Sequence, residues 1–332
     1  MTTYPQIISK TLNIPQRKVE STIDLLAEGS TIPFIARYRK EATGSLDEVQ
    51  LADIQQELKK LMDLDKRRQT VLNTIEELGK LTPELRKRIE DCWDPVELED
   101  IYLPYKPKRK TRATMAREKG LEPLATAIFD QKKQDAVHLA QAFLNDEVAT
   151  VEDALQGARD IIAEWICEDE QARQKVRYAF KKGAQITSKL VRGKDEEAAK
   201  YQDYFAFSEP LKSCPSHRLL AIRRGEDEGF LRLSIAPDAE EVLYRLEQQF
   251  LLGSGDSTQQ VKEALHDCYD RLLSPSIETE FRNEAKEKAD EAAIQIFVDN
   301  LRQLLLAPPL GQNRVMGIDP GFRTGCKVVA LN

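Results

Sequence analysis

The sequence has few of the residues that build disulfide frameworks and metal sites. Its five cysteines are widely scattered and form no Cys-x-x-Cys pair, which argues against a disulfide scaffold and a structural zinc site. The three histidines do not combine with the cysteines into a set of four ligands at zinc-site spacing, so neither a metal nor another cofactor is expected. Aromatic residues make up only 7%, and the 15 glycines and 15 prolines favour neither disorder nor a β-rich fold.

Long apolar runs are missing as well. No stretch is long enough to cross a bilayer, and the first ten residues, MTTYPQIISK, lack the apolar core of a signal peptide. We therefore expect a cytoplasmic protein that meets no membrane. The formal net charge of the 332 residues is −7, so nucleic-acid binding is not expected from the chain as a whole. Such binding would require a local basic patch.

Helical periodicity dominates the rest of the sequence. YPQIISKTLN and PQRKVESTIDLLAEG predict two short helices over residues 4–13 and 15–29, separated by an Asn-Ile-Pro turn. The pair resembles a helix-turn-helix in length, and Gln16, Arg17 and Lys18 would then begin the recognition helix. Two ordinary packed helices are the alternative interpretation.

Two further signals mark where the next helices begin and end. Gly44 has the position of a C-terminal cap, and Ser45 with Glu48 forms a capping-box pattern that predicts the start of a long helix. The three prolines of LPYKPKRKTRA, residues 103–113, exclude a regular helix there. Helical periodicity then returns from residue 114 to about residue 182.

The periodicity changes near residue 203. DYFAFSE and GFLRLSIA are typical of short strands, and SHRLLAIRRGEDEG between them predicts a helix, so this part is a small α+β insert. Helical periodicity resumes at Asp238 and includes one long helix from Ser276 to Leu306, before the linker Pro308-Pro309. The length suits two or three domains, which we place at residues 1–200, 201–310 and 311–332.

The strongest local positive charge lies in YKPKRKTRATMAREK, residues 105–119, which we call the basic segment. Cations spaced along an extended loop can follow a phosphate backbone, and Tyr105 could add a stacking surface. The alternative is a solvated crossing segment whose arginines pair with the many carboxylates of the chain. Against one acid, Glu118, the cations are Lys106, Lys108, Arg109, Lys110, Arg112, Arg117 and Lys119.

A second basic group lies in ARYRKE and comprises Arg37, Arg39 and Lys40. Positions 37 and 40 lie on one helical face and could contact phosphate. The alternative is ordinary pairing along the helix with Glu41 or Asp47.

The last stretch, VMGIDPGFRTGCKVVALN, places Asp319 at the end of an apolar strand, before a glycine turn and a second strand. RNase H-like nucleases hold divalent metal with a carboxylate on such a strand, and actin-like ATPases bring the same turn close to phosphate. Neither chemistry works with a single carboxylate, because a two-metal site needs several acids. We therefore expect no metal site and no enzymatic activity.

Three long stretches together resemble the Tex family of bacterial transcription accessory proteins. They are STIPFIARYRKEATGSLDE, DPVELEDIYLPYKPKRKTRATMAREKGLEPLA and VMGIDPGFRTGCKVVAL, at residues 30–48, 94–125 and 315–331. They occur in the order expected of that family. The resemblance extends over essentially the whole chain.

The resemblance implies a mainly α fold. This fold would comprise an elongated multi-helix N-terminal region with a helix-turn-helix-like element, a small α+β insert, and the first β-hairpin of a truncated RNase H-like domain of the YqgF type. The helix-hairpin-helix and OB-fold parts of the family are absent, so we expect a fragment. Carried over by residue, the resemblance gives Asp319 as an incomplete or degenerate first-strand acid, Gly317 and Gly321 as turn glycines, and residues 105–119 as the family's basic segment.

The resemblance and the basic groups together predict a transcription accessory factor that binds RNA or DNA phosphates without catalysis, with RNA favoured over DNA. Transcription or translation machinery is a further expected partner, and no small-molecule substrate is expected. Two alternatives stay open: a metal-dependent RNase H-like nuclease of which only the first strand is present, and a scaffold that docks the transcription machinery. The expected phosphate contacts are Lys106, Lys108, Arg109, Lys110 and Arg112, with Arg37, Arg39 and Lys40.

Overall fold

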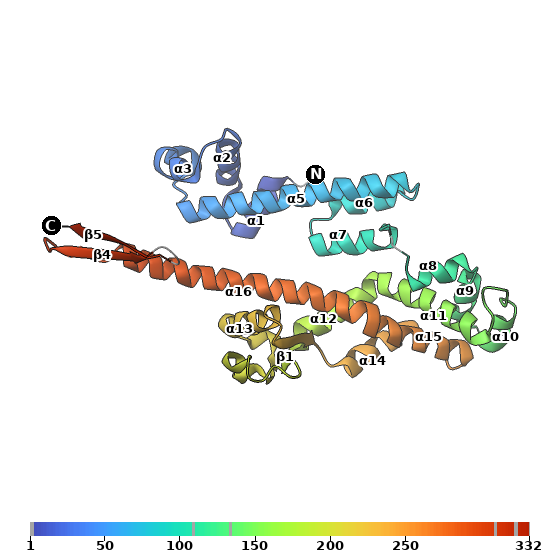
Figure 1. Cartoon of the computed structure of the whole chain (residues 1–332). Helices are drawn as coiled ribbons and strands as arrows, with labels where there is room; N and C mark the ends of the chain where they lie inside the picture. Colours follow the sequence, from blue (N-terminus) through green and yellow to red (C-terminus); the bar gives the residue numbers. More distant parts are fainter. Residues whose placement is uncertain (1–2, 108–109, 133–134, 309–310, 322–324, 332) are drawn as a thin grey trace. The chain divides into compact units, whose positions relative to one another are not determined.

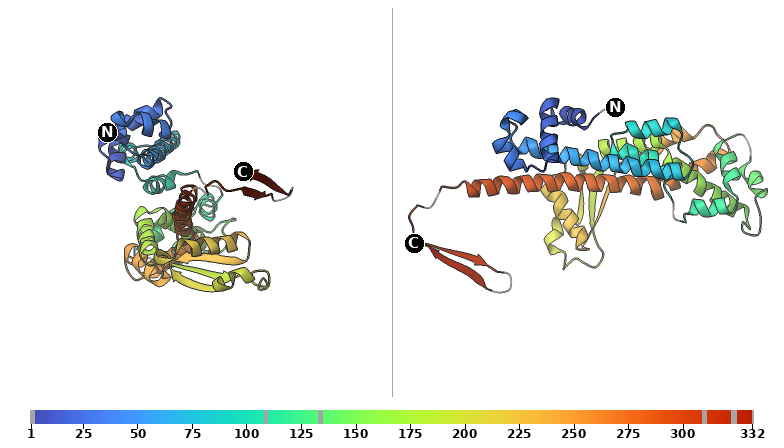
Figure 2. Two further views of the ribbon diagram at one scale, coloured as in Figure 1. Left: turned by 90° about the vertical axis from the view of Figure 1, so that its left-hand side faces the viewer. Right: turned by 90° about the horizontal axis from the view of Figure 1, so that it is seen from above.

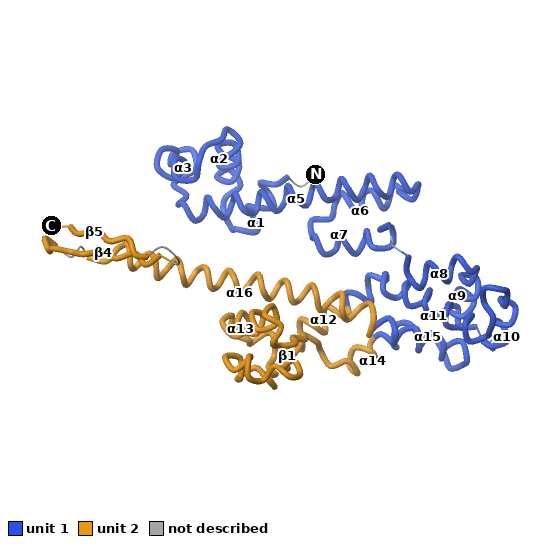
Figure 3. The backbone as a smooth tube through the Cα atoms, viewed as in Figure 1, with its two compact units in different colours: residues 1–174, 246–269 blue, residues 175–245, 270–332 orange. Residues whose placement is uncertain are grey.

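The chain is mainly helical, as predicted (Figure 1). It divides into two compact units, formed by residues 1–174 with 246–269 and by residues 175–245 with 270–332 (Figure 3). Within the residues described, no helix is both long and apolar enough to pass through a bilayer. The computed structural model describes residues 3–107, 110–132, 135–308, 311–321 and 325–331.

The first part of unit 1 is organised by the long helix α5. Asp47 caps this helix by accepting a hydrogen bond from the backbone N–H of Gln50, whose side chain accepts one from the N–H of Asp47 in return. The expected capping pair of Ser45 and Glu48 is wrong, because Ser45 has a left-handed backbone with a φ of 64°. The helices are α1 Tyr4–Leu12, α2 Gln16–Ala27, α3 Ile32–Tyr38, α4 Lys40–Thr43 and α5 Glu48–Glu77.

Two apolar clusters divide α5 between them. Ile8, Val19 and Ile35 pack with the first half of α5 and are fully buried. Ile75 and Ile89 belong to a second cluster, which the other half of α5 forms with the next two helices. Burial of a branched apolar side chain contributes about 1.5 to 3 kcal/mol, so these clusters fix the first seven helices. The second cluster includes α6 Pro83–Asp91 and α7 Pro95–Tyr102, which the short 3₁₀ turn η1 Leu103–Tyr105 follows.

The remainder of unit 1 packs around α11. Gly157 of α11 allows the segment around Leu121 to pack closely against this helix, because a Cβ at position 157 would lie 2.4 Å from Cδ1 of Leu121. Arg173 donates from Nε to Oδ1 of Asp100 at 2.6 Å, and both side chains are almost fully buried. The helices are α8 Arg112–Glu118, α9 Glu122–Phe129, α10 Ala136–Gln141, α11 Val151–Glu168 and α15 Asp256–Cys268.

Unit 2 contains a three-stranded antiparallel sheet in the order β2-β1-β3, with α13 and α16 packed beside β3 (Figure 2). Glu278 of α16 accepts a hydrogen bond from the backbone N–H of Ile235, and Arg282 donates to the carbonyl of Leu233. The central strand had no counterpart among the predicted elements. The elements that lie wholly or partly in unit 2 before β4 are α12 Glu170–Gly183, β1 Gln185–Leu190, η2 Ala199–Tyr204, β2 Ala206–Pro210, η3 Leu211–Ser213, α13 Ser216–Asp227, β3 Leu231–Ala236, α14 Ala239–Phe250, the π-helical turn Tyr269–Leu273 and α16 Ser274–Leu305.

The last two strands, β4 Val315–Pro320 and β5 Cys326–Leu331, pair only with each other among the strands described. Figure 2 shows them side by side as a two-stranded ribbon. Both faces carry exposed apolar side chains, including Met316, Ile318 and Val329. An isolated two-stranded ribbon gains little stability of its own in water.

Candidate nucleic-acid interface

The basic segment is partly loop and partly helix. Lys106 and Lys110 are exposed on the loop that joins η1 to α8, and Arg112 is exposed at the first position of α8. Thr111 caps this helix by accepting a hydrogen bond from the backbone N–H of Thr114 at 3.1 Å. The helix therefore begins at a fixed residue and holds Arg112 outward. Two of the predicted contacts, Lys108 and Arg109, lie outside the described residues.

Arg117 of the same segment serves the fold. Its guanidinium donates from Nη1 to Oε1 of Glu164 at 2.6 Å and from Nε to Oε1 of Glu122 at 3.3 Å. Thr111 donates its hydroxyl to the other carboxylate oxygen of Glu164 at 3.2 Å. Burial lowers the pKa of Arg117, but the hydrogen bond to Glu164 and both neighbouring charges raise it by more. The pairing that the alternative interpretation anticipated is therefore found at this arginine.

Lys110 also has an acidic neighbour, but a weaker one. Its Nζ lies 4.0 Å from Oε2 of Glu118, and both side chains are about two-thirds exposed. Such a pair contributes at most about 1 kcal/mol, because water screens it. Lys106, Arg112 and Lys119 form no ion pair within the part of the chain that the structure describes. The segment thus keeps part of its positive charge available for a phosphate backbone.

Arg37, Arg39 and Lys40 are all exposed, but they do not share one helical face as expected. The backbone of Arg39 leaves the helical region, with φ of −129° and ψ of 30°, so α3 ends at Tyr38 and the short helix α4 begins at Lys40. The anticipated pairing with Glu41 or Asp47 is not found among the described residues. Nη1 of Arg39 donates instead to the backbone carbonyl of Tyr38 at 3.3 Å.

Two of the three residues at the start of α2 that were expected to read nucleic acid form hydrogen bonds within the protein. The ammonium group of Lys18 donates to the carbonyl of Gly44 at 2.7 Å, and Gln16 donates to Glu20 one turn further along. Gly44 has a φ of +65°, and a Cβ there would lie 2.6 Å from Cε of Lys18. Arg17 is exposed. Only Arg17, of the three residues expected to read nucleic acid, is thus left without a partner within the described chain.

Asp319 lies in β4 directly opposite Lys327 of β5 and is exposed. No group of three histidine, cysteine, aspartate or glutamate side chains that could hold a metal is found in the described residues. Gly317 lies inside β4, where a Cβ would approach Val329 to 3.1 Å, so its expected place in the turn is wrong. Gly321 is placed as expected beyond the end of the strand, and its N–H donates to the carbonyl of Gly325 at 2.9 Å.

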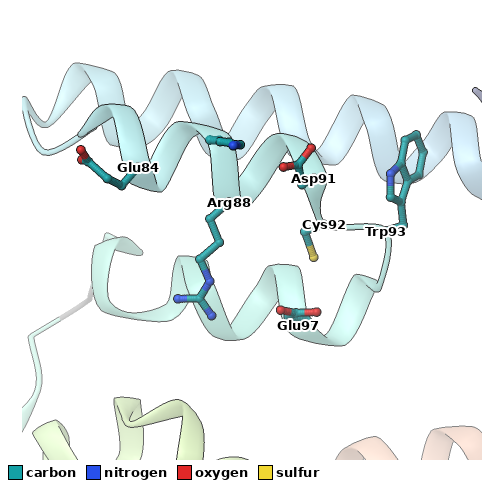
Figure 4. Close-up of a pocket in the computed structure, with 7 residues that line it drawn as sticks. Glu84, Arg88, Asp91, Cys92, Trp93 and Glu97 are labelled. Atoms are coloured by element: carbon teal, nitrogen blue, oxygen red, sulfur yellow. The ribbon is translucent and has the colours of Figure 1, made fainter. Parts of the chain in front are cut away.

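A hollow of about 510 Å³ between α6 and α7 has no single charge character (Figure 4). In this view Arg88 and Cys92 point toward α7, whereas Trp93 points away from it. Arg88 pairs with Glu170, and the guanidinium of Arg68 lies over the Trp93 ring, 4.1 Å from its centroid. Burial raises the pKa of the Cys92 thiol, so this sulfur is a poor nucleophile. We therefore assign no chemistry to the hollow.

The sequence itself matches two family models. The description Tex-like protein N-terminal domain applies to residues 2–76, and Tex central region-like applies to residues 131–297, which is half of the chain. The chain belongs to the Tex family. Both matched ranges end before β4 and β5, so these two matches do not depend on those strands.

Relatives of this Tex-family chain occur in bacteria and in animals. YdcI of Bacillus subtilis is 44% identical over 333 residues, which cover 97% of this chain and 46% of the relative. The transcriptional accessory protein Tex of Neisseria gonorrhoeae is 39% identical, and the aligned part covers 98% of this chain and 44% of the length of that relative. The human S1 RNA-binding domain-containing protein 1 is 30% identical, and the aligned part covers 98% of this chain and 34% of the length of the human protein. The chain therefore spans less than half of each relative.

Two exposed aromatic residues beside the second basic group were not predicted as functional residues. Phe34 and Tyr38 of α3 are both exposed, although aromatic residues are scarce in this chain. Their spacing of four positions in PFIARY was a usable signal, because residues i and i+4 lie on one helical face.

Proposed function

We propose that this Tex-family chain binds nucleic acid through exposed cations of unit 1 and performs no catalysis. One observation carries the proposal. In a chain with a formal charge of −7, several exposed cations of unit 1 have no acidic partner among the described residues. Positive charge that no carboxylate neutralises is what a phosphate backbone recognises, since binding releases counterions. These free cations include Arg37, Arg39, Lys40, Lys106 and Arg112.

The relatives support RNA as the ligand. The human relative is named for S1 RNA-binding, and the Neisseria gonorrhoeae relative is named a transcriptional accessory protein. We extend these two names to this chain as part of the proposal, together with contact to the transcription machinery and a cytoplasmic location. The proposal also takes α1 and α2 as a helix-turn-helix-like element, and β4 with β5 as the first strands of an RNase H-like domain in which Asp319 alone builds no metal site.

The test is titration of labelled RNA with the purified chain, followed by fluorescence anisotropy at several salt concentrations. The affinity should fall steeply as salt rises, because the interactions are ionic. A variant of the basic segment with Lys108, Arg109, Lys110 and Arg112 changed to alanine should bind more weakly. The logarithm of its binding constant should also depend less on salt, by about 0.7 for each phosphate of a single strand that the variant no longer neutralises.

The matched control removes the same four charges from unit 2. It carries alanine at the exposed residues Lys181, Lys182, Lys189 and Arg192, which belong to or follow α12 and β1. The control should bind with nearly the affinity of the unchanged chain. Equal losses in both variants would mean that only the total charge matters, and the basic segment would then have no special role.

A further inference from the structure

The outer face of α3 carries two aromatic rings in contact with each other. The ring centroids of Phe34 and Tyr38 lie 5.4 Å apart, with their planes tilted by 44°. Phe34 is 39% exposed and Tyr38 is 63% exposed. The opposite face of α3 carries Ile35 and Ala36, which are buried in the core with α5. Ile35 and Ala36 therefore attach α3 to the rest of the unit.

Positive charge without an acidic partner in the described chain lies beside these rings. The guanidinium carbon of Arg39 lies 5.2 Å from the Phe34 ring centroid, and Arg37 lies one turn from Phe34 along α3. No carboxylate pairs with either arginine, or with Lys40, in the described part of the chain. Aromatic rings beside free cations complement a ligand that is itself both planar and anionic, which describes a base joined to its phosphate.

Other aromatic pairs in the molecule have a structural role. Phe180 and Phe281 lie 5.2 Å apart between centroids, and Phe180 is 1% exposed. Trp93 contacts Tyr4 on one side and has the Arg68 guanidinium over its ring. Those rings contribute to the core or to the joints between helices. The rings of α3 differ because water covers much of each.

We propose that Phe34 and Tyr38, flanked by Arg37, Arg39 and Lys40, form a platform on which the bases of single-stranded nucleic acid stack. The inference rests on the proposed function and specifies the form of the nucleic acid. In a duplex each base already stacks on its neighbours, so the rings of α3 have no free base face to contact. In a single strand the base faces are available, and the cations can hold the phosphates on either side.

The decisive variant is Tyr38→Ala, assayed with a labelled single strand and with a duplex containing the same strand. Loss of one stacked base weakens binding by roughly five-fold or more. We expect this loss for the single strand and an unchanged affinity for the duplex. Because stacking is not ionic, the weaker binding should keep the same dependence on salt, unlike the binding of the basic-segment variant.

Two further variants make the test specific. Tyr244→Ala removes an equally exposed tyrosine from α14, at 64% exposure, and should leave both affinities unchanged. Tyr38→Trp should restore binding of the single strand. Its indole fluorescence, corrected for the two native tryptophans, should also be quenched when a base stacks on it. Unchanged thermal unfolding of all three variants would show that the folds are intact.

The outcomes separate this inference from the proposed function. Salt-dependent binding by the unchanged chain, with Tyr38→Ala equal to Tyr244→Ala, overturns the platform but leaves the nucleic-acid function in place. Equal losses for single strand and duplex also overturn the platform, because stacking on free bases cannot explain them. Absence of binding by the unchanged chain removes the proposed function and the platform together. In that case the rings would be left to cover a protein surface.

Discussion

The basic segment and α3 differ in how much of their positive charge remains free. The basic segment has more cations in the sequence. However, its Arg117 forms ion pairs with Glu164 and Glu122, and its Lys110 has Glu118 as an acidic neighbour. The smaller group at the end of α3 has no acidic partner in the described residues. The number of cations in a stretch is therefore a poor measure of its attraction for phosphate. That attraction depends on which carboxylates the fold brings near.

The largest expected effect is a loss of stability when Arg117, the paired arginine of the basic segment, is replaced, in contrast to the exposed Arg112. Arg117→Ala removes the guanidinium from Glu164, whose side chain is only 11% exposed. Loss of one partner from such a pair costs about 2 to 4 kcal/mol, somewhat less than for a fully buried pair. We expect that loss in the free energy of unfolding by urea, with the RNA affinity of the folded fraction nearly unchanged.

Arg112→Ala is the matched change, five positions earlier on the same helix. It should alter the free energy of unfolding by no more than about 0.5 kcal/mol, because Arg112 is exposed and unpaired in the described chain. It should weaken RNA binding instead. If the two variants were equally stable, the contrast between inward and outward arginines would disappear.

A second prediction tests the free charge at the end of α3 and the start of α4. Changing Arg37 and Lys40 together to alanine should reduce the dependence of log K on log salt by about 1.4, since each cation contacts one phosphate of a single strand. The free energy of unfolding should stay within about 0.5 kcal/mol of the original, because both side chains are exposed. Salt titrations by anisotropy measure the first quantity, and urea unfolding measures the second. An unchanged salt dependence would show that α3 makes no phosphate contact.

The smallest expected effect concerns the acid within the basic segment. Glu118→Gln removes the partner of Lys110 and one source of repulsion for phosphate. The pair is highly exposed, so the change in RNA affinity should be an increase of only about two-fold at low salt. Glu41→Gln, which alters an exposed acid of α4 with no ion-pair partner among the described residues, gives the corresponding value for α3. A fall in affinity after Glu118→Gln would contradict the role given to Lys110.

Periodicity was a sound guide where an element depends on its own sequence. The predicted insert helix, its second strand and the long helix near the end correspond to α13, β3 and α16. β1 was not predicted, because the residues that complete it are distant: Ser188 pairs with Phe207 on one side and Leu233 on the other. Local patterns do not record such pairings.

The candidate site shows the same division. The cations could be found from the sequence, and so could the spacing of Phe34 and Tyr38. The sequence could not show that the charge of Arg117 is neutralised, because its partner Glu164 lies 47 positions away. The prediction that Arg37 and Lys40 share one helical face failed for a related reason. A single non-helical residue, Arg39, ended the helix where periodicity alone would have continued it.

The contact between Lys18 and Gly44 bears on how related sequences should be read. A residue with a side chain at position 44 would be strained by the left-handed backbone and would displace Lys18 from its hydrogen bond, so folding alone favours glycine there. Invariance of that glycine across a family would therefore carry no information about ligands. Position 38 is under no such constraint, since its side chain lies mostly in water. Retention of an aromatic residue at position 38 over long divergence would be a record of selection by something outside the chain.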